Sequence, residues 1–121
     1  MHNDPLRLGV IGCGLATKNL HWPALRNLTD KFRIVAVCNH TPDKAREFAQ
    51  IAGLNKFETD YRRLLDSPEI DAVLVSLPID KNAAVTRDCL AAGKHVLCEK
   101  PLAHNLEEAK TLRDFAAQSS A

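Results

Sequence analysis

The chain has 121 residues, of which 45% are hydrophobic and 26% are charged, and its formal net charge is +1. This length allows one domain with a real core. The near-neutral balance argues against a nucleic-acid-binding arm, and no apolar run approaches the roughly 18 residues that a membrane span needs. We therefore expect neither a nucleic-acid partner nor a membrane partner. The amino terminus also lacks the basic-then-apolar layout of a signal peptide, so the expected location is the cytoplasm.

Apolar runs of strand length alternate with segments of helical period from one end of the chain to the other. The predicted strands are Leu6–Gly12, Phe32–Cys38, Lys56–Glu58, Ala72–Leu77 and His95–Cys98. The predicted helices cover 15–28, 42–52, 61–65, 81–92 and a last segment that begins after Asn105. Strand–helix alternation implies parallel strands with right-handed crossovers. The expected fold class is therefore α/β, a doubly wound parallel sheet of the Rossmann type.

Several boundaries carry recognisable start signals. Pro23 should either kink the first helix or start a second turn after Trp22. Asn105 and Glu108 form an N-cap and its capping-box partner for the last helix. The residues of that helix expected to face inward are Leu106, Ala109, Leu112, and Phe115 or Ala116.

The first predicted strand runs into a glycine-punctuated turn, Gly12-Cys-Gly14-Leu15-Ala16-Thr17. Glycines at such a turn let backbone amides approach a phosphate without a Cβ in the way. The pattern approximates G-x-G-x-x-G, which binds the pyrophosphate of a dinucleotide, with Thr17 in the third small position. The Thr17 hydroxyl could donate to a phosphate oxygen. At this point a glycine-rich turn without a ligand stays open as an alternative.

The residues that follow the second strand bear on the choice of cofactor, because ligands of such sheets lie beyond the carboxyl ends of the strands. A domain that prefers NAD usually places Asp or Glu here, against the ribose hydroxyls. This chain has Asn39, followed by three possible donors to a 2′-phosphate: His40, Thr41 and Lys44. The charge pattern therefore favours NADP over NAD. Two alternatives remain: Asn39 contacts the ribose of either cofactor, or Thr41 only caps its helix.

The fourth and fifth strands end on Leu77-Pro78 and on Glu99-Lys100-Pro101, which we assign to the same site. An ammonium held near a nicotinamide could polarise a carbinol or carbonyl and assist proton transfer as the hydride moves. Lys100 is therefore the candidate catalytic residue, and Glu99 could orient it or pair with it. The alternative is an exposed lysine in a turn.

The four cysteines contain no C-x-x-C pair and no zinc-ligand spacing, and no two histidines are spaced i, i+4. We expect no metal site. The cysteines are interpreted as buried free thiols.

Two blocks of sequence carry a resemblance to a known family. They are Gly9–Gly14 with His21–Leu25, and Ala91-Ala-Gly-Lys-His-Val-Leu-Cys-Glu-Lys-Pro-Leu-Ala103. The chain resembles, over essentially its whole length, the glucose–fructose oxidoreductase/inositol dehydrogenase/rhizopine-catabolism (Gfo/Idh/MocA) family. The resemblance implies an NAD(P)-dependent oxidoreductase of sugars, polyols or related hydroxy compounds, often dimeric or tetrameric. It also implies that Lys100 lies near the nicotinamide ribose and the substrate.

Members of this family usually carry a C-terminal α/β substrate domain as well. Five strands are predicted here, against six in a complete sheet. Residues 1–121 are therefore interpreted as an NAD(P)-binding domain truncated before its last strand and that substrate domain, and inactive alone. An uncovered last strand predicts a homo-oligomer.

The chain departs from the family pattern at Thr17, at Asn39 and at Pro78-Ile-Asp-Lys-Asn82, which lacks the histidine of P-N-x-x-H. The alternative function is a non-catalytic dinucleotide-sensing or interaction module on the same fold. A methyltransferase-like domain is a third possibility, but it would want an acidic residue where Asn39 stands.

Overall fold

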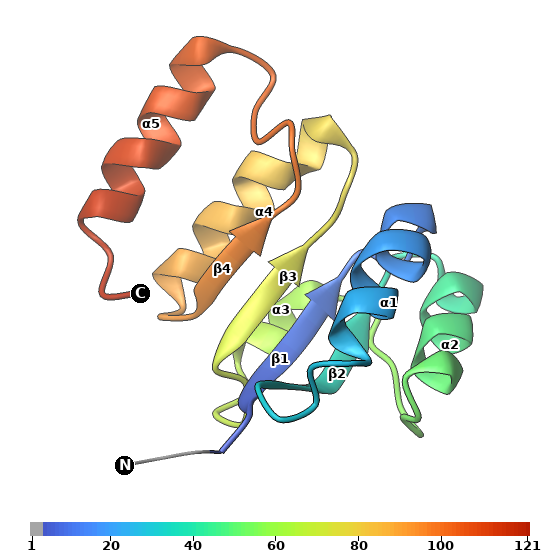
Figure 1. Cartoon of the computed structure of the whole chain (residues 1–121). Coiled ribbons are helices and arrows are strands. Elements are labelled where there is room, and N and C mark those ends of the chain that lie inside the picture. Colours follow the sequence, from blue (N-terminus) through green and yellow to red (C-terminus); the bar gives the residue numbers. More distant parts are fainter. Residues whose placement is uncertain (1–3) are drawn as a thin grey trace.

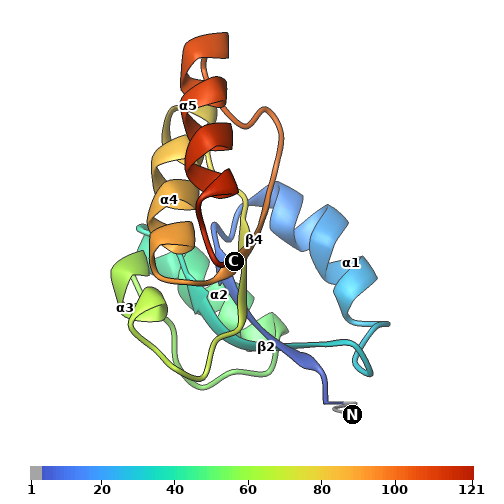
Figure 2. The same cartoon turned by 90° about the vertical axis from the view of Figure 1, so that its left-hand side faces the viewer.

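The computed structural model describes residues 4–121 as a parallel sheet with helices packed on both faces (Figures 1 and 2). The strands, in the spatial order β2-β1-β3-β4, are β1 (Leu6–Ile11), β2 (Phe32–Cys38), β3 (Ala72–Val75) and β4 (His95–Cys98). The helical elements are the π-helical turn η1 (Thr17–His21), α1 (Trp22–Leu25), α2 (Pro42–Ile51), α3 (Tyr61–Leu65), α4 (Ile79–Ala91) and α5 (Leu106–Ala117). The predicted α/β fold of Rossmann type is confirmed.

The expectation that the amino terminus is not a signal peptide falls partly on residues 1–3, which lie outside the described residues. Within residues 4–121, no helix is both long and apolar enough to cross a bilayer.

The prediction of a third strand at Lys56–Glu58 is wrong, and within residues 4–121 the sheet has four strands rather than five. Only Glu58 pairs, in a single bridge to Cys38 at the edge of β2. Phe57 packs against the core, and the carboxylate of Asp60 accepts the Arg62 amide to cap α3. The segment therefore leaves the sheet after one bridge, because the next residues already start a helix.

The order of the strands creates a crevice at one edge of the sheet. β1 pairs with β2 on one side and with β3 on the other, and all pairs are parallel. The chain runs from β1 outward to β2 and then crosses to β3 and β4 on the opposite side. The loops after β1 and β3 therefore diverge, which is where ligands of open α/β sheets bind.

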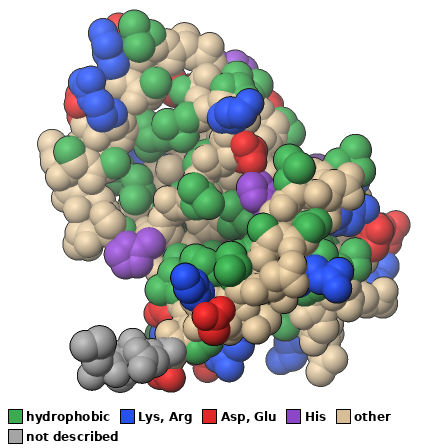
Figure 3. Space-filling model, in the orientation of Figure 1, with side chains coloured by type: hydrophobic (Ala, Val, Ile, Leu, Met, Phe, Trp, Pro, Cys, Tyr) green, Lys and Arg blue, Asp and Glu red, His purple; other side chains and the backbone are tan. Residues whose placement is uncertain are grey.

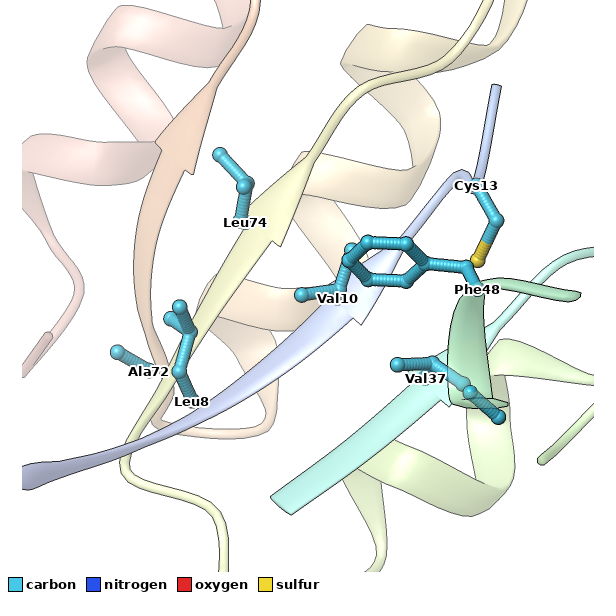
Figure 4. Close-up of a cluster of buried hydrophobic side chains, with 8 residues drawn as sticks. Leu8, Val10, Cys13, Val37, Phe48, Ala72 and Leu74 are labelled. Atoms are coloured by element: carbon cyan, nitrogen blue, oxygen red, sulfur yellow. The ribbon is translucent and has the colours of Figure 1, made fainter. Parts of the chain in front are cut away.

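Alternate residues of the central strands supply two cores, one on each face of the sheet. On the first face, Val10 and its neighbours on β1, β2 and β3 pack under Phe48 of α2, which is fully buried (Figure 4). Trp22 meets the Phe48 ring edge-on at a centroid distance of 6.0 Å. On the second face, Val75 and its neighbours pack against Leu64 of α3 and Val85 of α4. Burial of each large side chain contributes about 2 kcal/mol, which holds the strand ends rigid.

Two helix starts follow their local signals, whereas one residue predicted to face inward does not. Pro23 lies in the first turn of α1, after η1, so of the two predicted alternatives it starts a second helical segment. Asn105 accepts the Glu108 amide at 2.8 Å, and Glu108 in turn accepts the His104 amide. Leu112 is buried, but Leu106 is 68% exposed, contrary to the prediction. The reason is that α5 packs on α4 rather than on the sheet.

An apolar groove of about 430 Å³ lies on the face of β1, β3 and β4 that also carries α1. Leu74 and Leu97 line it, and Leu97 is 67% exposed on the outermost strand. Figure 3 shows hydrophobic side chains gathered over the middle of this face.

Candidate dinucleotide site

The turn after β1 is shaped by two glycines with different roles. The Gly12 amide donates to the Cys38 carbonyl at 2.9 Å, which continues the sheet into the turn. Gly12 has φ +102°, and a Cβ there would lie 2.0 Å from the Ser76 carbonyl oxygen. By contrast, a Cβ at Gly14 would meet nothing within 4 Å. The absence of a Cβ at Gly12 thus lets the turn after β1 lie against the Ser76 backbone after β3. The absence of a Cβ at Gly14 leaves free space beside the turn.

Thr17 has a structural role that the sequence did not indicate. Its hydroxyl donates to the Gly12 carbonyl at 2.5 Å, and the residue is 1% exposed. The hydroxyl that we expected to be available to a phosphate oxygen therefore already has a backbone acceptor in this structure. The third position of the glycine pattern instead ties the start of η1 back to the turn.

Asn39 holds the turn after β1 and the loop after β2 together. Its Oδ1 accepts the Cys13 amide at 3.0 Å, and its Nδ2 donates to the Thr41 carbonyl at 3.3 Å. Thr41 is the N-cap of α2, but its hydroxyl makes no bond to the helix amides. That hydroxyl, with the exposed side chains of His40 and Lys44, lines the adjacent cleft.

Asn82 is the residue that sequence reasoning missed. It was noted only because it stands where the family motif has histidine. It is 1% exposed; its Oδ1 accepts the Leu77 amide at 3.1 Å, and its Nδ2 donates to the carbonyls of Glu99 and Pro101 at 3.3 and 3.1 Å. It therefore joins the loop after β3 to the residues on both sides of Lys100. Its helical spacing with Val85 and Cys89, which places it on the buried face of α4, was the signal that could have revealed it.

Glu99 makes two contacts with its carboxylate. Oε1 accepts the Lys100 backbone amide at 3.0 Å, and Oε2 lies 2.7 Å from His21 Nε2. These contacts, the Lys100 amide first, lower the pKa of Glu99 below its ordinary value. Glu99 thus orients Lys100 through its backbone. Lys100 is exposed and lines the cleft, and within the described part of the chain its ammonium makes no hydrogen bond.

These loops surround one cleft of about 550 Å³ at the carboxyl edge of the sheet, called here the carboxyl-edge cleft. The predicted site residues that line it are Gly14, Leu15, Ala16, Asn39, His40, Thr41, Lys44, Leu77, Pro78, Glu99 and Lys100. Gly12, Thr17 and Pro101 do not line the cleft, although the Gly12 and Pro101 carbonyls accept hydrogen bonds from Thr17 and Asn82. The lining residues that were not predicted are Ile11, Cys38, Thr59, Tyr61, Ser76, Lys81 and Val85.

The composition of the cleft suits a dinucleotide. Its volume lies in the range of cofactor sites. Its ammonium groups come from Lys44, Lys81 and Lys100, while Glu99 is the single carboxylate of the lining and is already paired. The open space at Gly14 gives the backbone of the turn access to a diphosphate. A polyanion with two ribose units fits this arrangement.

The cysteines do not take part in this chemistry. Burial raises the pKa of the thiols of Cys13, Cys38 and Cys89 to about 12. They are therefore protonated and inert at neutral pH. Cys98, partly buried, is also unpaired. Among residues 4–121, no group of three or more His, Cys, Asp or Glu side chains is placed to hold a metal ion.

Comparison with known proteins places the chain in a family. Residues 6–121 match the family model described as "Oxidoreductase family, NAD-binding Rossmann fold". A dTDP-3,4-didehydro-2,6-dideoxy-alpha-D-glucose 3-reductase from Saccharopolyspora spinosa is 36% identical over 96% of this chain and 34% of its own length. The crystal structure of an oxidoreductase from Thermotoga maritima superimposes with a TM-score of 0.92 at 39% identity, over 96% of this chain and 36% of that one. A 3-ketoreductase from Actinomadura kijaniata, in complex with NADP and TDP-benzene, gives a TM-score of 0.85 at 34% identity, over 94% and 34%.

Fold, cleft and comparisons define an NAD-binding domain of the Rossmann type. The chain belongs to the Gfo/Idh/MocA family of oxidoreductases. It spans about a third of the length of the curated relatives that it matches.

Proposed function

We propose that the carboxyl-edge cleft binds NADP, and that the chain serves as the cofactor-binding domain, residues 1–121, of an enzyme that oxidises or reduces a sugar-like hydroxyl or carbonyl group. The observation that carries this proposal is the placement of Gly14 and Lys100 on one cleft, although 86 positions separate them in the sequence. The nicotinamide, when bound, supplies the hydride acceptor or donor. The relatives support the substrate class, because one reduces a dTDP-sugar by name and another was crystallised with a TDP ligand.

The residues of the cleft divide the work of binding. Backbone amides of the turn around Gly14 would hold the diphosphate. Lys44 and His40, at the start of α2, would favour a 2′-phosphate, and the Thr41 hydroxyl is available as a further donor. Asn39 is occupied by backbone contacts on both sides of its amide. Because position 39 holds an amide and not a carboxylate, no negative charge at this position would repel the 2′-phosphate of NADP.

Lys100 would act on the substrate. Its ammonium donates a hydrogen bond to the oxygen of the reacting carbinol or carbonyl, which stabilises negative charge that develops there as the hydride moves. Asn82 and Glu99 hold the backbone on either side of Lys100, so that only its side chain has to be ordered during the reaction. We infer that turnover needs further parts of a longer protein, since relatives are about three times as long.

Parallel titrations of the chain with NADPH, NADH and S-adenosylmethionine, followed by calorimetry, test this proposal. We expect the nicotinamide cofactors to bind with NADPH the tighter, and S-adenosylmethionine not to bind. Binding of S-adenosylmethionine alone would contradict it. Binding of NADPH without any substrate-dependent hydride transfer in a longer parent protein would favour the sensing module instead.

We also infer that the chain self-associates through the outer edge of β4. The strand lies at the margin of the sheet, beside the apolar groove and the exposed side chain of Leu97. Edges of this kind pair readily. Light scattering over a range of concentrations should show a dimer, and a monomer at all of them would remove this inference.

A further inference from the structure

One pair of side chains links the element that follows the glycine turn to the turn that carries Lys100. His21 is the last residue of η1, and its Nε2 lies 2.7 Å from Oε2 of Glu99, 78 positions later in the chain. The two side chains are 22% and 28% exposed, so the contact is largely shielded from water. In the order of the sheet, β3 lies between β1 and β4. The pair therefore connects the chain that follows β1 to the chain that follows β4, across the position of β3 in the sheet.

The same carboxylate also contacts the backbone of Lys100. While Oε2 faces His21, Oε1 accepts the Lys100 amide at 3.0 Å. Both contacts lower the pKa of Glu99, so the carboxylate stays charged and keeps both partners. The orientation of the Lys100 backbone thus depends on where His21 holds the Glu99 side chain.

A second anchor acts from the opposite side and makes the role of His21 separable. Asn82, on α4, donates to the carbonyls of Glu99 and Pro101. Asn82 ties the Lys100 turn to α4, and none of its hydrogen bonds within residues 4–121 goes to η1. Among the hydrogen bonds of residues 4–121, the His21–Glu99 contact is the one that relates the Lys100 turn to η1.

We propose that His21 is a positioning residue that, through Glu99, sets Lys100 relative to the glycine turn. This inference rests on the proposed function, because it assigns the two ends of one dinucleotide to the two sides of the pair. The diphosphate would bind at the glycine turn and the nicotinamide beside Lys100. His21 would thereby fix the distance between the two binding points, and the nicotinamide end would contribute to affinity only while the pair is intact.

The test compares His21→Ala with His21→Gln, which retains a donor of similar reach, and with His104→Ala as a matched control at an exposed histidine. Each variant of the full chain is titrated with NADPH and with 2′-phospho-ADP-ribose, which lacks the nicotinamide. We expect His21→Ala to weaken NADPH binding about 5- to 10-fold, the loss of roughly one hydrogen bond. Binding of 2′-phospho-ADP-ribose should change less than about 2-fold, within the spread of a distant surface change. His21→Gln should recover most of the loss.

The backbone amide resonance of Lys100, recorded without any ligand, gives a readout that does not depend on binding. It should shift in His21→Ala and return towards its wild-type position in His21→Gln. If wild-type protein bound neither probe, the proposed function would fail, and this resonance would still decide whether His21 orders the Lys100 turn.

Two results would overturn the inference. One is an equal loss of affinity for both probes, which would confine His21 to the stability of η1. The other is a His21→Ala variant in which neither NADPH affinity nor the Lys100 resonance changes. If His21→Ala does not fold, Glu99→Ala removes the same link from the other side and must produce the same difference between the probes.

Discussion

The two rims of the sheet use charged side chains in opposite ways. At the amino ends of the strands, Arg7 forms two side-chain bonds to Asp71, of 2.9 and 3.0 Å. Lys94, which is 8% exposed, donates to the carbonyls of Ser67 and Ile70 at 2.7 and 2.8 Å. These charges are satisfied by the chain itself, and the rim is tied together by them.

At the carboxyl ends, the side chains that hold the loops are mostly neutral. Asn39 and Asn82 bridge backbone groups of neighbouring loops, and the carboxylate of Glu99 faces His21 and a backbone amide. Lys44 and Lys100 line the cleft, where their ammonium groups are available to a ligand. One rim therefore serves stability and the other is prepared for an anion, and variants on each rim should separate the two properties.

The largest effect is expected at Gly12, where the two properties meet. Gly12→Ala places a Cβ 2.0 Å from the Ser76 carbonyl at a φ of +102°, which should cost roughly 3 kcal/mol of unfolding free energy and disrupt the turn. Urea denaturation measures it. Gly14→Ala is the matched control: its Cβ meets nothing within 4 Å, so it should fold normally but bind NADPH more weakly. Equal stability of Gly12→Ala and wild type would contradict the packing of β1 against β3.

A smaller loss of stability, without loss of binding, is expected at Lys94. Lys94→Met keeps the length of the side chain but leaves two carbonyls without their donor. The unfolding free energy should fall by about 2 kcal/mol, while NADPH affinity is unchanged because the residue lies at the rim opposite the cleft. A variant as stable as wild type would mean that desolvation of the ammonium cancels its two bonds.

The difference between the rims also explains what the sequence could and could not predict. The strand–helix order and the residues after each strand follow from hydrophobic period and turn residues, and these placed Gly14, Lys44 and Lys100 at one edge. The failures concern polar side chains that face inward. The backbone partners of Asn82 depend on which loops become neighbours, and no local pattern encodes that. The bond of Thr17 to the Gly12 carbonyl is local, but it depends on the conformation of the turn. The prediction of a strand at Lys56–Glu58 is wrong for a similar reason, because the pairing of a strand depends on its partner in the sheet.

Acid should weaken the amino-end rim. The hydrogen bonds from Arg7 lower the pKa of Asp71 from 3.8 to about 2. A carboxyl group whose pKa is lower in the folded state stabilises the fold above its unfolded pKa, and this contribution disappears as the pH falls from about 4 towards 2. Asp71→Asn should therefore flatten the pH dependence of the urea midpoint over that range. Asp114→Asn, at an exposed ion pair, is the control, and an equal effect would contradict a special role for Asp71.

The smallest effect is expected from Lys44, and it bears on the choice of cofactor. Its ammonium is exposed at the start of α2, so its interaction with a 2′-phosphate is screened by solvent and salt. Lys44→Ala should weaken NADPH binding about 3- to 5-fold, or up to about 1 kcal/mol, and leave NADH binding nearly unchanged. Lys110→Ala, on the exposed side of α5, controls for net charge. The difference between the cofactors should shrink as salt is added, because an exposed charge acts through solvent. If Lys44→Ala weakened NADH as much as NADPH, Lys44 would contact a group common to both, and the preference for NADP would have to arise from His40 or Thr41 alone.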